Sequence, residues 1–166
     1  MKFLIYVGDH KKDTWLVQAG WWLTRRVQSG AFKQVTHMEC VLSGANYKNC
    51  EIASSSARDG GVRIKPNVAL TKNNWRVLDA SKFYAEESRT WFDVHQGAPY
   101  SWVGAAATKL TAFQFLALAL RGFFCNWACL ASCGLLGAYK ETPSQSCERL
   151  ARDFGAVDVT AEFFTD

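Results

Sequence analysis

The sequence predicts an α+β fold, with an antiparallel sheet in its first half and helices packed against that sheet in its second half. The first half contains short apolar runs separated by turn sequences, which is typical of strands. In the second half, apolar residues recur at helical spacing, and between 103 and 139 the only charged residues are Lys109 and Arg121. With 166 residues, 49% of them hydrophobic, the chain is long enough to bury one core. We therefore expect a single domain over 1–166.

Five segments of the first half have strand character. The opening run, 1–7, is apolar and stops at Gly8-Asp9, too early for a secretory signal sequence. Turn sequences at 43–46 and 59–61 separate several of the others. The remaining expected strands cover 35–42, 50–56, 62–65 and 75–78. Within 35–42, the period of two places Val35, His37, Glu39 and Val41 on one face and Thr36, Met38, Cys40 and Leu42 on the other.

Helical patterns cover most of the remaining chain. We expect helices over 13–29, over 81–96 with Ser81 as N-cap, and over two buried apolar segments between 103 and 139, the second beginning near Cys125. Thr142-Pro143 predicts the start of a last helix to Phe154, with Gly155 after it. The uncharged run before Arg121 has 11 residues, short of the roughly 20 needed to span a bilayer. No stable membrane insertion is expected.

The charge pattern gives no indication of nucleic-acid binding. The net charge is +4, and basic residues are scattered, with Lys11-Lys12 and Arg25-Arg26 the only adjacent pairs. Mild attraction to an anionic polymer such as a cell wall stays open. Six cysteines without an export signal favour reduced thiols and a cytoplasmic location, although delivery to a cell wall or virion stays open.

Cys125 is the candidate nucleophile. A cysteine that opens a helix lies among unpaired amides at the positive end of the helix dipole, which favours its thiolate. Cys129 and Cys133 follow at intervals of four on the same stripe and are expected to be small core residues. A linear stripe of thiols does not close a tetrahedron, so no metal or other cofactor is predicted.

His37 is the candidate general base, and a buried structural histidine is the alternative. Glu39 shares its face, and a half-buried strand face with both groups is costly unless they have partners or a task. A catalytic imidazole needs a polar group to orient it, which Glu39, Glu51 or Ser54 could supply. Glu39 is our prediction for that partner.

Three further residues are candidates for contacts with substrate. Tyr100 follows Pro99 at a predicted helix stop, where its hydroxyl could reach a pocket, although packing is the alternative role. Ser54 and Asn126 complete the set of predicted substrate-binding residues. His10 and His95 are expected to be structural or surface residues.

Four local motifs resemble the circularly permuted branch of the NlpC-like papain-fold cysteine hydrolases, the YiiX-like group with many phage members. The resemblance covers residues 36 to 137, in that family's order of histidine before cysteine. They are similar to its His-x-Glu strand, following hairpin, Tyr-Asp-Trp-x-Gly segment and Phe-Cys-Ser-Glu-Trp-x-Cys helix start. The matching segments are 36–42, 54–63, 97–104 and 123–129. Ser101, Asn126 and Trp127 depart from the family's usual Asp, Ser and Glu.

The resemblance implies a papain-like fold and a thiol hydrolase with Cys125 as nucleophile, His37 as general base and Glu39 as its polar partner. The implied substrates are amide bonds of a peptide or cell-wall peptide, and the family most suggests those of peptidoglycan stem peptides. A lipid acyl hydrolase or acyltransferase of the same fold is an alternative, and the apolar region 103–139 could line its pocket. Two others stay open: a catalytically silent phage or virion-associated binding module, and a membrane-associated protein with 110–124 as an interfacial helix.

Overall fold

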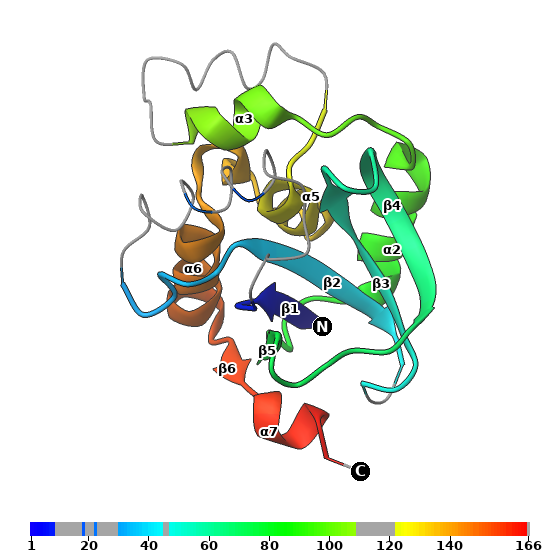
Figure 1. Cartoon of the computed structure of the whole chain (residues 1–166), viewed down its shortest axis with the longest axis vertical. Helices are drawn as coiled ribbons and strands as arrows, with labels where there is room; N and C mark the ends of the chain where they lie inside the picture. Colours follow the sequence, from blue (N-terminus) through cyan, green and yellow to red (C-terminus); the bar gives the residue numbers. More distant parts are fainter. Residues whose placement is uncertain (9–17, 19–21, 23–29, 45–46, 109–121, 166) are drawn as a thin grey trace.

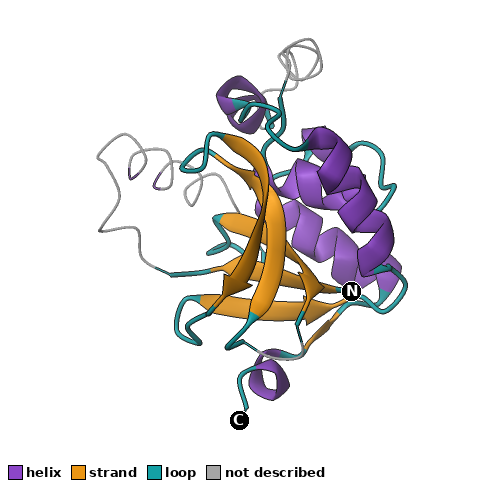
Figure 2. Cartoon of the chain, turned by 90° about the vertical axis from the view of Figure 1, so that its right-hand side faces the viewer, coloured by secondary structure: helices purple, strands orange, loops and turns teal. Residues whose placement is uncertain are grey.

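A six-stranded antiparallel sheet carries helices mostly on one face (Figure 1, Figure 2). The computed structural model describes residues 1–8, 18, 22, 30–44, 47–108 and 122–165. The predicted α+β class is confirmed. No helix among these residues has the length and apolar character needed to cross a membrane.

The sheet has the strand order β4-β3-β2-β1-β5-β6, with the first strand of the chain near its middle. All five predicted strands are present. The fourth is longer than the predicted 62–65, and Pro66 is tolerated there because β4 is an edge strand. β6 was not predicted, since two residues are too few to show a period. The strands are β1 (Lys2–Tyr6), β2 (His37–Ser43), β3 (Cys50–Ser56), β4 (Gly61–Val68), β5 (Trp75–Asp79) and β6 (Val157–Asp158).

The described helices are short. They are α2 (Ala85–His95), α3 (Trp102–Ala107), α5 (Cys125–Ser132), the 3-10 helix η2 (Ala138–Lys140), α6 (Pro143–Phe154) and α7 (Thr160–Phe163). The predicted helix over 13–29 lies outside the described residues except for Gln18 and Trp22, and so does the segment 109–121. Burial was wrongly predicted for Val103 of α3, which is about half exposed.

The predicted N-cap at Ser81 is wrong. Helix α2 begins at Ala85, after Tyr84, and no side chain caps it. The preceding turn is fixed by the chain terminus instead, because the Met1 ammonium donates to the carbonyls of Ala80 and Phe83, both at 2.9 Å. These contacts hold the turn outside the helix.

Helix α6 begins and ends as the sequence predicts. The Thr142 hydroxyl accepts from the Gln145 amide at 3.3 Å, and the Gln145 side chain accepts from the Thr142 amide at 2.9 Å. This is a capping box with Pro143 at the first helical position. Gly155 ends the helix with a left-handed φ of 67°.

Apolar side chains pack on both faces of the sheet. One cluster lies between the sheet and the helices α2, α5 and α6, and a smaller one lies between the other face and α7. Met38, Cys40 and Leu42 point to the larger cluster and Val41 to the smaller one, as the predicted alternation requires. Val35 was assigned to the wrong face: it packs in the larger cluster because it precedes the regular strand, which begins at His37.

We expect Thr142→Ala to lower the free energy of unfolding by about 1 kcal/mol, because it removes the N-cap of α6. Denaturant unfolding of the variant and the wild type measures the difference. Thr142→Ser is the matched control, since it keeps the hydroxyl and should stay within about 0.5 kcal/mol of the wild type. Equal stabilities of the two variants would contradict this role of the cap.

Candidate active site

The candidate site lies where two neighbouring strands separate. Pairing between β2 and β3 runs from Ser43 opposite Glu51 to Cys40 opposite Ala53. Toward the beginning of β2 the strands splay apart, and the start of α5 lies between them (Figure 1).

Where β2 and β3 separate, side chains of α5 and β3 donate hydrogen bonds to main-chain carbonyl groups. The Met38 carbonyl accepts from the Ser54 hydroxyl at 2.7 Å and from the Cys129 thiol at 3.5 Å. The Ser55 hydroxyl donates at 2.7 Å to the carbonyl of Phe123, just before α5. These bonds attach the start of the helix to both strands.

Cys125 is the first residue of α5 and is 3% exposed. The preceding residue, Phe124, offers no side-chain cap to the helix. Main-chain amides of Met38 and Asn126 donate hydrogen bonds to the Cys125 sulfur. These amides favour the charged form of the sulfur, the thiolate.

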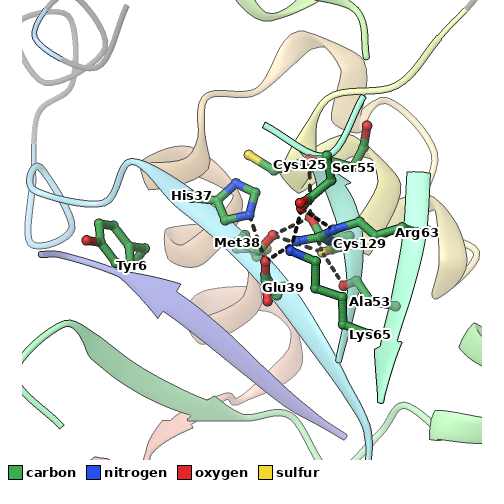
Figure 3. Close-up of polar contacts among 12 residues, drawn as sticks. Tyr6, His37, Met38, Glu39, Ala53, Ser55, Arg63, Lys65, Cys125 and Cys129 are labelled. Carbon is green, nitrogen blue, oxygen red and sulfur yellow. Dashed lines mark hydrogen bonds and ion pairs between the residues drawn. The ribbon is translucent and has the colours of Figure 1, made fainter. Parts of the chain in front are cut away.

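His37, the first residue of β2, contacts both of the other predicted catalytic residues. Its Nε2 donates to Glu39 Oε1 at 3.0 Å. Its other nitrogen faces the Cys125 sulfur (Figure 3), and the two side chains are hydrogen-bonded. The structure thus brings Cys125, His37 and Glu39 together in the predicted order.

Arg63 is the next polar group after Glu39, and it was not predicted from the sequence. From β4 its Nη2 donates to Glu39 Oε1 at 2.5 Å, and its Nε donates to Asp59 Oδ2 at 2.7 Å. Lys65 pairs with the same Asp59 oxygen at 2.7 Å. The signal for Arg63 was a general one: a buried carboxylate such as Glu39 requires a cation nearby.

The electrostatics of the site favour a thiolate and an imidazolium. Burial raises the pKa of Cys125, but the positive charge and hydrogen bond of His37 and the two main-chain amides outweigh it, and the net pKa is lowered. Burial alone would lower the pKa of His37. The thiolate of Cys125 and the carboxylate of Glu39 more than offset that effect and raise the pKa of His37 to about 9.

Cys125 differs in this respect from the other five cysteines. All six are free thiols. Burial raises the pKa of each of the others, to about 12 for the half-buried Cys133. The predicted core role fits the surroundings of Cys129, which packs in the larger cluster. The other cysteines whose thiol pKa is raised are Cys40, Cys50, Cys129 and Cys147.

Of the three candidates for orienting His37, Glu39 makes the contact. Burial raises the pKa of Glu39, but the hydrogen bond from His37 and the charge of Arg63 outweigh it and lower the net pKa. Glu51 instead pairs with Arg89 of α2. Ser54 is fully buried, and its hydroxyl is bonded to the Met38 carbonyl.

The three residues predicted to contact substrate lie in different surroundings. Ser54 and Asn126 are both 0% exposed, and the Asn126 amide donates to the Glu141 carbonyl at 2.8 Å and to the Ser146 hydroxyl at 2.9 Å. Both therefore hold the framework together. Tyr100 is half-buried and forms a bridge with Phe123, and burial together with the nearby Cys125 charge raises its pKa. Its place beside the nucleophile suits a contact with substrate.

The chain matches no protein-family model, no curated protein and no solved structure. Within the described residues, no group of three or more histidine, cysteine, aspartate or glutamate side chains is arranged to hold a metal ion. What the geometry offers is a buried thiol paired with an imidazole, which in turn is held by a carboxylate. Such a set can attack an electron-poor carbonyl carbon.

We expect iodoacetamide at pH 7 to alkylate Cys125 much faster than the other five thiols, because its pKa alone is lowered. His37→Gln should slow this alkylation by roughly tenfold or more, since burial then raises the pKa of Cys125 without an opposing cation. Mass spectrometry of labelled peptides gives each rate. Cys133→Ser is the control and should leave the rate at Cys125 unchanged; equal, slow labelling of all six thiols would contradict the lowered pKa.

Proposed function

We propose that the protein is a papain-like thiol hydrolase that cleaves amide bonds, with those of peptidoglycan stem peptides as its substrate class. The observation that carries this proposal is the contact of Cys125 with His37, which is itself held by Glu39. The resemblance of the four sequence motifs to permuted NlpC-like hydrolases supports the substrate class. The net charge of +4 suits an anionic polymer.

In the proposed reaction, the Cys125 thiolate attacks the amide carbonyl and His37 donates its proton to the departing amine. An acyl-enzyme thioester results. His37, now neutral, takes a proton from water as the water attacks the thioester, and the Cys125 thiolate is released. Glu39 keeps the imidazole oriented throughout, because its carboxylate accepts from Nε2.

The start of α5 supplies donors for the oxyanion of this reaction. The first amides of a helix have no partner within the helix, and they lie at its positive end. The amide of Cys125 belongs to this set, since Cys125 is the first residue of α5. A carbonyl attacked by the sulfur would place its oxygen near that amide.

Hydrolysis or transfer of lipid acyl groups is a second candidate, favoured by one feature of the surface. Trp102 and Val103 are about half exposed, and the Trp102 ring lies 5.1 Å from the ring of Tyr100. Tyr100 in turn lies close enough to Cys125 to be affected by its charge. An apolar surface thus adjoins the nucleophile, and an acyl chain could pack on it.

Purified peptidoglycan and acyl thioesters of increasing chain length distinguish these functions. Release of new amino groups from peptidoglycan supports the amidase, and turnover of thioesters that rises with chain length supports the acyl hydrolase. Cys125→Ala should abolish either activity, whereas Cys133→Ser should retain it. No turnover of either substrate by the wild type would count against an enzyme and favour the silent binding module.

The hydrolytic rate should depend on pH as a bell-shaped curve. As pH rises through about 9, His37 loses the proton that it gives to the leaving amine, so the rate falls. As pH falls through the lowered pKa of Cys125, the thiolate is protonated and the rate falls again. Initial rates across pH 4 to about 10.5 measure both midpoints. A rate that keeps rising above the His37 midpoint would contradict the proton-donating role of the imidazole.

A further inference from the structure

Arg63 is held between two carboxylates next to the candidate catalytic residues (Figure 3). Its side chain is 13% exposed and reaches from β4 toward β2. Asp59, four residues earlier in the hairpin, accepts from its Nε at 2.7 Å, and Glu39 accepts from its Nη2 at 2.5 Å. Because a guanidinium is planar and rigid, these two bonds fix the place of Glu39 relative to the hairpin.

A single oxygen of Glu39 joins Arg63 to His37. Oε1 accepts both from Arg63 Nη2 and from His37 Nε2, at 2.5 and 3.0 Å. The other oxygen, Oε2, is buried and has no partner among the described residues. The position of the carboxylate therefore depends on Oε1, and without Arg63 only His37 would hold that oxygen.

We propose that Arg63 is a positioning residue: anchored by Asp59, its guanidinium holds the Glu39 oxygen that keeps His37 against Cys125. This inference rests on the proposed function only in treating Cys125 and His37 as the reactive pair. It requires no particular substrate.

The positioning role has a consequence that loss of the Arg63 charge alone would not produce. Loss of the charge alone makes the thiol and the imidazolium release their protons less readily, so both titration midpoints would move to higher pH. Loss of the hold on Glu39 lets His37 move away from Cys125. In that case the thiol midpoint rises while the imidazole midpoint falls, because each group loses the opposite charge of the other.

The test compares Arg63→Met with the wild type in two measurements. The alkylation rate of Cys125 by iodoacetamide across pH gives the thiol midpoint, and NMR titration gives the imidazole midpoint of His37, one of only three histidines. We expect the thiol midpoint to rise and the imidazole midpoint to fall, each by about half a pH unit or more. On the acid limb the rise of the thiol midpoint lowers the alkylation rate about threefold. Arg63→Lys, which restores the charge, should move both midpoints back toward the wild type.

Arg76→Met is the matched control. Arg76 also lies on a strand and pairs with an aspartate, Asp158, with its Nη2 at 2.6 Å from the carboxylate, but it belongs to β5. This variant should leave both midpoints unchanged. Asp59→Asn gives an independent test if Arg63→Met does not fold: it removes the carboxylate that anchors Arg63, so the thiol midpoint should rise, whereas loss of the negative charge alone would lower it.

Unchanged midpoints in Arg63→Met, or two midpoints that both rise, would overturn the positioning role. So would a fall or no change of the thiol midpoint in Asp59→Asn. These outcomes are separate from failure of the proposed function. If the wild-type Cys125 is unreactive, the hydrolase proposal fails, and the His37 titration in Cys125→Ala, with and without Arg63→Met, still tests the link between Arg63 and His37.

Discussion

A buried negative charge at Glu39 is the constraint on which the rest of the site depends. A carboxylate out of water is costly unless charged partners surround it, and this one is 5% exposed. Its partners come from both sides: His37 on the same strand and Arg63 on β4. The hydrogen bond from His37 that helps stabilise the buried carboxylate of Glu39 also holds the imidazole in place.

The separation of β2 from β3 is the second condition. Where the strands part, the Met38 peptide group loses its neighbour on β3, and the sulfur and hydroxyl groups of α5 and β3 replace it. The same contacts hold Cys125 beside His37. Cys129 on the helix and Cys133 just after it lie in surroundings where burial raises the pKa of each thiol. Of these three cysteines, only Cys125 contacts a cation, and only its pKa is lowered.

Much of the fold follows from local sequence. The apolar runs and turns predicted five strands, and the cap and proline of Thr142-Pro143 predicted the start of α6, since both signals act within a few residues. Where distant contacts compete, local signals were overruled. The Met1 ammonium holds the turn that contains Ser81 outside α2, and Val35 lies beyond the end of the regular strand. The sequence next to Ser81 and the sequence next to Val35 indicate neither of these two features.

By itself, the sequence determined the chemical types available and their approximate placement: a cysteine at a helix start, and a histidine and a glutamate on one strand face. Helix polarity and strand periodicity are local properties, so they could be inferred without coordinates. Only the tertiary structure decided which groups meet. It chose Glu39 over Glu51 and Ser54, gave Asn126 a framework role, and added Arg63, because strand register and the splaying of β2 from β3 set distances between residues far apart in the chain.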